Sequence, residues 1–171
     1  RGSDVPAGEL VLLLARAKAA DVAHRLHASE PDFDGLVIGG DSMFALGGRV
    51  YGKPYTPAEA KRRWQEMRGN TGVLHSGPSV FRLSPGAEPE EATSVAEASV
   101  TFAPEVTDAE IDAYVASGEP LHVAGAFTVD SLGGAFITRV EGDPSTVVGM
   151  SLSVLRRLAA DLGVRWTDLW N

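Results

Sequence analysis

The fold class follows first from residues 35–41, which read GLVIGGD. Three apolar residues, two of them β-branched, stand between glycines. This pattern predicts a short buried strand that runs into a tight turn at Gly39-Gly40. Asp41 is then expected at the end of the strand, where a side chain at the rim of a sheet can meet a ligand.

Signals of regular structure lie on both sides of this strand. Apolar residues at helical spacing predict a helix over 6–28, and Gly47-Gly48 predicts a hairpin. Thr56 and Thr107 have the sequence context of N-cap residues. The other expected elements are strands at about 43–46, 49–51, 72–83, 93–102 and 135–140 and helices at about 57–67, 108–115 and 145–162. Strands and helices alternate irregularly, which favours a single mixed-sheet α/β domain over residues 1–171.

Composition narrows the class of protein. The 171 residues include 15 Lys and Arg against 23 Asp and Glu, a formal net charge of −8, and 44% are hydrophobic. The acidic excess argues against a general binder of nucleic acid or anionic membranes, because both partners call for surplus Lys and Arg. No apolar run is long enough to span a bilayer, and the lack of cysteine excludes disulfides and thiolate metal sites. We therefore expect a cytoplasmic protein with no nucleic-acid or membrane partner.

A carboxylate and an amine are predicted to meet near the hairpin. Lys53 follows Asp41 by twelve residues, and the hairpin returns the chain toward the same end. The two groups suit a metal-bound phosphate, because a cation and an ammonium can share its charge. Asp41 could equally cap a turn, and Lys53 could be a solvated turn residue. Glu119, in a glycine-rich segment, is a second candidate carboxylate or an ordinary loop residue, and Lys18 reaches either a pocket or solvent.

Five segments in order along the chain resemble the Maf family of nucleoside triphosphate pyrophosphatases. They are LARAKA at 14–19, VIGGDS at 37–42, GKP at 52–54, SGEPL through AGAF at 117–127, and VEGDP through VVGM at 140–150. Each segment alone is a weak signal. Their common order and spacing make the resemblance specific and extend it over nearly the whole chain.

This resemblance implies a mixed twisted sheet with flanking helices and two lobes around a nucleotide cleft, as in inosine triphosphatase. It also implies a homodimer that hydrolyses a nucleoside triphosphate to the monophosphate and pyrophosphate with Mg²⁺ or Mn²⁺. Asp41 would bind the metal or activate water, Lys53 would hold phosphate oxygens, and Glu119 would be a second metal or water ligand. Lys18 and Ser42 would be further substrate contacts.

The chain departs from the family pattern in three places. The family opens with a strand and a Ser-x-x-Arg-Arg loop that cradles phosphate, and nothing before Asp4 supplies it, so we expect the natural N-terminal strand and loop to be missing from the sequence. Val123 stands where many relatives have Lys, and the family's Gly-Arg-Thr-His becomes GNTG at 69–72. These losses keep open a second hypothesis, a nucleotide-binding regulator of cell division or septum formation with little turnover.

The base preference is expected to depend on Asp130. Relatives that favour dTTP or UTP typically have Gln here, which offers a donor and an acceptor to a pyrimidine edge. A carboxylate only accepts, so it suits the adjacent N–H donors of guanine and a cationic base such as that of 7-methyl-GTP. The neighbouring Phe127 and Leu132-Gly133 also resemble the 7-methyl-GTP branch. The alternative is that Asp130 only forms a turn before Ser131.

Overall fold

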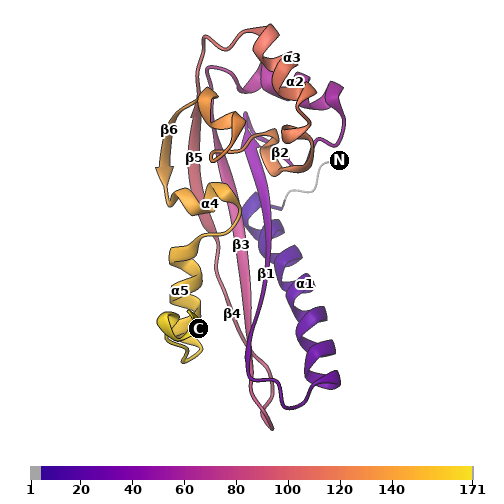
Figure 1. The fold of residues 1–171 in the computed structure, drawn as a ribbon, viewed down its shortest axis with the longest axis vertical. Coiled ribbons are helices and arrows are strands. Elements are labelled where there is room, and N and C mark those ends of the chain that lie inside the picture. The colour runs from indigo at the N-terminus through magenta and orange to yellow at the C-terminus, as the bar shows by residue number, and fades with distance from the viewer. Residues whose placement is uncertain (1–4, 171) are drawn as a thin grey trace. The chain divides into compact units, whose positions relative to one another are not determined.

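The structure is a computed structural model that describes residues 5–170. In this range five α-helices flank a six-stranded sheet, which confirms the predicted mixed α/β fold (Figure 1). The opening residues 1–3, on which the expected loss of an N-terminal strand bears, lie outside the described residues. In chain order the elements are α1 (Ala7–Ser29), β1 (Gly35–Leu46), β2 (Arg49–Tyr51), α2 (Pro57–Met67), β3 (Thr71–Leu83), β4 (Glu90–Thr93), β5 (Ala96–Phe102), α3 (Asp108–Ala116), β6 (Ile137–Gly142), α4 (Pro144–Val148) and α5 (Leu152–Asp161), with the 3-10 helices η1 (Glu119–His122), η2 (Ala124–Ala126), η3 (Leu132–Phe136) and η4 (Trp166–Leu169).

The sheet has the strand order β2-β1-β3-β5-β6, and β4 pairs with β3. β1 and β2 form the predicted hairpin, in which Leu46 pairs with Arg49. Gly47 and Gly48 between them have φ values of 56° and 78°, the left-handed conformation that a two-residue hairpin turn with matching twist requires.

Between residues 5 and 170, none of the helices combines the length and the apolar character needed to cross a membrane.

The chain divides into two compact units. The described part of the first unit comprises residues 5–41, 76–96 and 149–170, and the second comprises 42–75 and 97–148. The interpretation of residues 1–171 as one domain stays a prediction.

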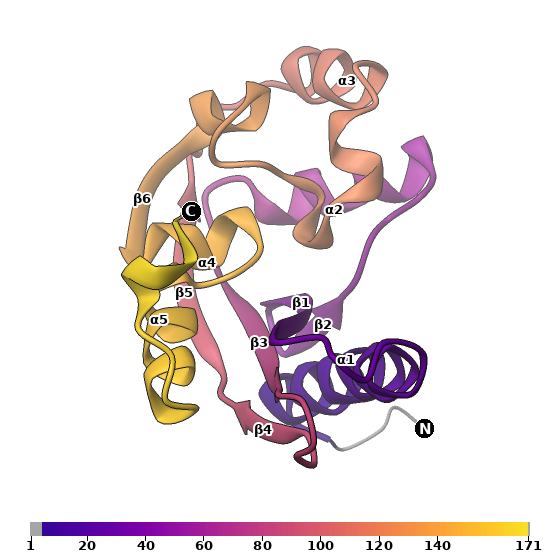
Figure 2. The ribbon, with the colours of Figure 1, turned by 60° about the horizontal axis from the view of Figure 1, so that its bottom comes forward.

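In the first unit, helices α1 and α5 cover opposite faces of β3 (Figure 2). Val80 packs with Leu155 of α5, whereas the next residue, Phe81, packs with Ala19 and Ala23 of α1. Consecutive strand residues point to opposite faces, so a short apolar run supplies the cores on both sides of the strand.

β1 continues unbroken through Gly39-Gly40-Asp41, so the predicted glycine turn is wrong. Neither glycine has a positive φ. A Cβ on Gly39 would lie 2.7 Å from the Cβ of Ala19, and a Cβ on Gly40 would lie 2.6 Å from Cε of Met150. The two glycines therefore allow close packing of neighbouring elements. Asp41 lies inside a regular strand instead of at its end.

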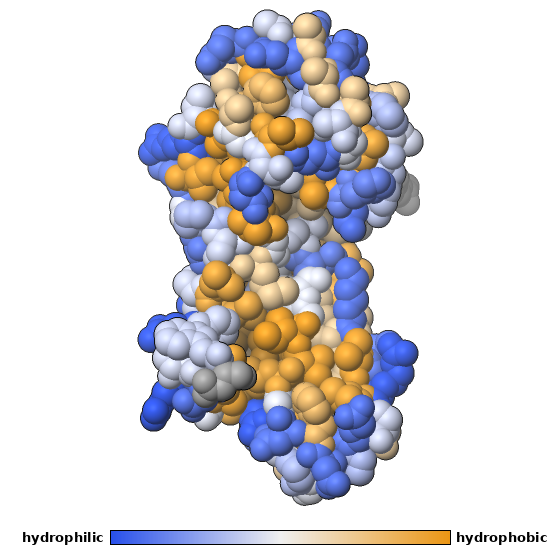
Figure 3. Space-filling view, in the orientation of Figure 1, coloured by the Kyte–Doolittle hydropathy of each residue, from blue (hydrophilic) through white to orange (hydrophobic). Residues whose placement is uncertain are grey.

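β1 is also less buried than its apolar run predicts. Val37 is buried among α1 residues, but Ile38 on the other face is 43% exposed. Figure 3 shows apolar surface over the strands of the first unit, in the lower part of the view. Burial on both faces therefore does not hold for this part of β1.

The second unit has an aromatic core around Trp64 of α2. This side chain is fully buried, and its Nε1 donates to the backbone oxygen of Ala126 at 2.7 Å. Its ring meets the rings of Phe102, Tyr114 and Phe136 edge to face, with centroid distances of 5.3, 5.4 and 5.6 Å. Such pairs contribute about 0.5–1.5 kcal/mol each beyond burial. The core thus joins α2, α3, β5 and η3 of the second unit.

The helix starts predicted at Thr56 and Thr107 are confirmed. The hydroxyl of Thr56 accepts from the amide of Glu59 at 3.3 Å, and Thr107 and Glu110 form a reciprocal capping box. Each cap satisfies amides that have no partner inside the helix. A local signal was therefore sufficient at both positions.

Three other predicted elements differ from the structure. The helix expected over 145–162 is interrupted at Gly149, whose φ is 142°, and α5 starts anew where the Ser151 hydroxyl accepts from the amide of Val154. The strand expected over 93–102 is divided between β4 and β5. β6 begins at Ile137 because the preceding residues form η3.

Candidate active site

Asp41 and Lys18 form an ion pair in the first unit, with 3.1 Å between Nζ of Lys18 and Oδ1 of Asp41. Alternate residues of a strand share a face, so Asp41 lies on the same face as Gly39. Ala19 of α1 lies against Gly39, and Lys18 is the residue before it. Packing of α1 on β1 therefore brings together a predicted catalytic residue and a predicted substrate-binding residue.

The pair is on the surface, where its contribution to stability is small. The side chains of Lys18 and Asp41 are 59% and 22% exposed, and such pairs contribute about 0–1 kcal/mol. The alternative that Asp41 caps a turn is wrong, because the residue lies within β1. The Asp41 carboxylate and the Lys18 ammonium are thus both accessible to a charged ligand.

Ser42 follows Asp41 on β1 and is half-buried. Consecutive side chains of a strand point to opposite faces, so Ser42 does not share the face of Asp41. Its assignment as a substrate contact stays a prediction.

Lys53 lies on the exposed turn between β2 and α2 in the second unit. Its amine forms no hydrogen bond or ion pair with any residue in the described range 5–170. The backbone amide of Tyr55 donates to the carbonyl of Leu121 at 2.9 Å, and the ring of Tyr55 meets that of His122 at 6.4 Å. These contacts place the turn that carries Lys53 against η1, which begins at Glu119.

Glu119 accepts hydrogen bonds on both carboxylate oxygens. Oε1 accepts from the hydroxyls of Tyr114, at 3.0 Å, and Thr128, and from the amide of Gly133 at 3.3 Å. Oε2 accepts from the amide of Leu132 at 3.1 Å. One carboxylate therefore fastens both ends of the segment from Thr128 to Gly133. The assignment of Glu119 as a catalytic residue and metal ligand stays a prediction beside this positioning role.

The hydrogen bonds also determine the charge of this cluster. Burial raises the pKa of Glu119, but the bonds from Thr128, Gly133, Tyr114 and Leu132 outweigh burial and hold the pKa below its ordinary value. Burial raises the pKa of the Tyr114 hydroxyl, and the carboxylate of Glu119 adds to this rise. At neutral pH, Tyr114 is therefore the donor and Glu119 the charged acceptor.

Asp130 lies in the middle of the fastened segment and is exposed. Its carboxylate accepts no hydrogen bond from residues 5–170. The segment is therefore held by Glu119, and the carboxylate of Asp130 is open to a ligand. The expected contact of Asp130 with the nucleotide base stays a prediction.

Phe127 is 3% exposed and belongs to the core of the second unit. Its ring packs edge to face with those of Phe44 and Phe102 at 5.4 and 5.0 Å. Packing alone accounts for an aromatic residue here, and its contact with substrate stays a prediction. Of the candidate residues, Lys18 and Asp41 thus share the first unit, and the others share the second, namely Ser42, Lys53, Glu119, Phe127 and Asp130.

Comparison with known proteins agrees with the resemblance seen in the sequence. A family described as Maf-like protein matches residues 2–162. The chain belongs to the Maf family. A relative from Leifsonia xyli subsp. xyli is 59% identical over 95% of this chain and 74% of its own length. One from Salinispora tropica is 52% identical over 96% of this chain and 71% of its own length. One from Thermosynechococcus vestitus is 48% identical over 95% of this chain and 78% of its own length. All three are named nucleoside triphosphate pyrophosphatase.

The resemblance to Maf proteins implies a divalent cation, which oxygen atoms of the side chains would have to bind. Residues 5–170 contain no cluster of three or more His, Asp or Glu side chains that could hold a metal ion. Mg²⁺, however, is commonly bound by one or two carboxylates together with water and substrate phosphates. The accessible carboxylate of Asp41 fits this mode, in which the triphosphate completes the coordination.

The glycine that replaces histidine in the Maf motif has a packing reason. A Cβ on Gly72 would lie 2.1 Å from Cζ of Phe44. The ring of Phe44 therefore occupies the space that a larger side chain at position 72 would need.

Sequence reasoning missed the residues that support the site. Tyr114 and Thr128 bind Glu119 from 5 and 9 residues away, and Gly133 is tightly enclosed, since a Cβ there would lie 2.5 Å from the Tyr114 hydroxyl oxygen. Only the glycine-rich composition of the segment hinted at such close packing. Tyr114 was expected only as part of a helix.

Proposed function

We propose that this chain hydrolyses a nucleoside triphosphate to the monophosphate and pyrophosphate with the help of Mg²⁺ or Mn²⁺. The observation that carries the proposal is the Lys18–Asp41 pair, built from two motifs of the Maf family on packed elements. The names of the relatives support the reaction.

We further propose that the protein acts in the cytoplasm as a homodimer. Light scattering tests the oligomeric state, and a mass of 18.0 kDa, that of a single chain, would contradict the homodimer.

In the proposed reaction a water oxygen attacks the α-phosphorus of the triphosphate. The bond from this phosphorus to the bridging oxygen breaks, the electron pair leaves on pyrophosphate, and the water proton passes to the Asp41 carboxylate. The cation, held by Asp41, would neutralise charge on the phosphate oxygens. Lys18 orients the Asp41 carboxylate, and the amine of Lys53 binds phosphate oxygens.

The test is pyrophosphate release from dTTP, UTP, GTP, CTP and 7-methyl-GTP with Mg²⁺ or Mn²⁺. We expect release from at least one substrate, with the monophosphate formed in equal amount and no release in the presence of EDTA. If no substrate is hydrolysed while nucleotides still bind, the chain is the nucleotide-binding regulator of the second hypothesis. Orthophosphate as the product would exclude cleavage between the α- and β-phosphates.

Base choice is proposed to depend on Asp130, whose exposed carboxylate only accepts hydrogen bonds. Asp130→Gln is expected to change the ratio of kcat/KM for UTP over GTP by about tenfold or more in favour of UTP, because a hydrogen bond to a charged group contributes about 1.5–3 kcal/mol. The measurement is pyrophosphate release on the same panel. Ser131→Ala, at the exposed neighbouring position, should leave the ratio unchanged. An unchanged ratio in Asp130→Gln would reduce Asp130 to a turn residue.

A further inference from the structure

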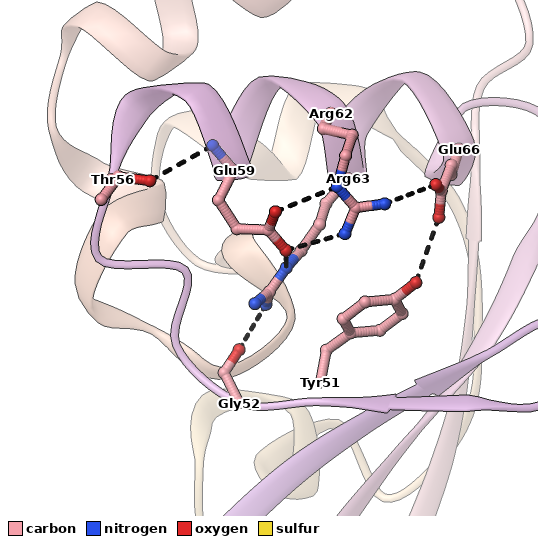
Figure 4. Close-up of polar contacts among 7 residues, drawn as sticks. All are labelled: Tyr51, Gly52, Thr56, Glu59, Arg62, Arg63 and Glu66. Atoms are coloured by element: carbon pink, nitrogen blue, oxygen red, sulfur yellow. Dashed lines mark hydrogen bonds and ion pairs between the residues drawn. The ribbon is translucent and has the colours of Figure 1, made fainter. Parts of the chain in front are cut away.

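Arg63 of α2 is a buried cation that the proposed reaction does not use. It is 7% exposed, its Nε donates to Oε1 of Glu59 at 2.7 Å, and its Nη1 donates to the backbone oxygen of Gly52 (Figure 4). A charge is buried only where it is paired and hydrogen-bonded. Here one of the partners is the backbone of the residue directly before Lys53.

Tyr51 confines the guanidinium of Arg63 further. The guanidinium carbon lies 4.7 Å from the centroid of the Tyr51 ring, and the Tyr51 hydroxyl donates to Oε2 of Glu66 at 3.1 Å (Figure 4). A planar guanidinium can stack on a ring and donate in fixed directions, which an ammonium cannot do. The orientation of Arg63 is therefore well defined, and so is that of the carbonyl it binds.

The turn is held on the far side of Lys53 as well. Pro54 is buried, and the amide of Tyr55 donates to the carbonyl of Leu121 at 2.9 Å. The backbone is thus hydrogen-bonded on both sides of Lys53, whose side chain is exposed. Stabilising a phosphate charge depends on such placement, since a displacement of about 1 Å can cost about 10²-fold in rate.

We infer that Arg63 is a positioning residue for Lys53, which fixes the turn from which the Lys53 amine reaches phosphate by binding the carbonyl of Gly52. The inference rests on the proposed role of Lys53. Stability alone is a weaker reason for this residue, because buried ion pairs often add little to stability relative to well-packed apolar residues.

Arg62 offers a matched control on the same helix. It also binds Glu59, with 2.8 Å from Nη2 to Oε1, but its side chain is 43% exposed and its Nη1 pairs with the Glu66 carboxylate at 2.6 Å. Its guanidinium carbon lies 6.0 Å from the centroid of the Tyr51 ring, farther than that of Arg63. Hydrogen bonds from Arg62 and then Arg63 lower the pKa of Glu59 to about 2. Glu59 therefore stays ionised, with Arg62 as partner, when Arg63 is replaced.

The experiment is a double-mutant cycle of Arg63→Gln with Lys53→Met, beside Arg62→Gln, in chains shown by circular dichroism to be folded. Pyrophosphate release gives kcat and KM, and calorimetric binding of inorganic triphosphate is a readout that needs no turnover. We expect Arg63→Gln to lower kcat/KM and triphosphate affinity by about tenfold and Arg62→Gln to change them by less than about twofold. In the Lys53→Met background, Arg63→Gln should have almost no further effect.

Equal losses from Arg63→Gln in both backgrounds would overturn the inference, because Arg63 would then act independently of Lys53. The same holds if Arg62→Gln is as harmful as Arg63→Gln. If the wild-type chain releases no pyrophosphate, the proposed function fails, and the binding cycle still decides the role of Arg63. The inference is supported if Lys53→Met and Arg63→Gln each lower the affinity for triphosphate by a similar factor and the double variant lowers it no further.

Discussion

Asp41→Asn is expected to lower kcat for pyrophosphate release by about 10³-fold, within the range for loss of a general base or of a charge at the reacting centre. The substitution keeps the shape of the side chain but removes the negative charge that, in the proposed reaction, binds the cation and takes the proton. Folding should change little, since the pair with Lys18 is exposed and contributes about 0–1 kcal/mol. Thermal unfolding should therefore stay within a few degrees of wild type while the rate falls.

The control for this variant is Asp34→Asn. Asp34 belongs to the same unit and is also paired with a cation, with 2.5 Å between its Oδ1 and Nη1 of Arg82. Loss of a surface ion pair alone should leave the rate of Asp34→Asn close to that of wild type. Titration with Mg²⁺ adds a second measurement, in which Asp41→Asn should need a higher concentration for half-maximal rate. A wild-type rate in Asp41→Asn would remove Asp41 from the reaction.

Glu119→Gln is expected to destabilise the chain by about 2 kcal/mol at neutral pH, the scale of a lost hydrogen bond to a charged group. Its amide NH₂ group cannot accept the bond that the Leu132 amide donates to Oε2. The pKa of Glu119 is lowered in the folded chain below its ordinary 4.5. Its contribution to stability is therefore present above pH 4.5 and lost as the pH falls below that value. The difference in Tm between wild type and variant should be full at pH 6–8 and shrink below about pH 4.

Glu141→Gln is the matched control, because Glu141 lies in the same unit but is 58% exposed and, among residues 5–170, is paired only with the surface residue Arg139. Its Tm should stay close to that of wild type at all pH values. Base preference should also relax in Glu119→Gln, since Asp130 lies on the segment that Glu119 fastens. A role for Glu119 confined to the metal would produce another result, namely an increased Mg²⁺ requirement with an unchanged Tm in EDTA.

Elements with local signals were predictable from the sequence. The caps at Thr56 and Thr107 and the Gly47-Gly48 turn depend on residues within a few positions of one another, so their amides and φ values can be inferred from neighbours alone. Gly39-Gly40 has the same local appearance as a turn. Its true reason, close packing against Ala19 and Met150, lies in other elements.

By itself, the sequence determined the mixed α/β class, most of the helices and strands, and, through the order of its motifs, membership in the Maf family. Only the tertiary structure decided which side chains meet. Lys18 reaches Asp41 from 23 residues away, Leu132 reaches Glu119 from 13 away, and Arg63 reaches Gly52 from 11 away. The physical reason is that hydrogen bonds and ion pairs act over a few ångströms. Such partners are therefore chosen by the packing of α1 on β1, of α2 on its turn and of η1 on the segment that follows it.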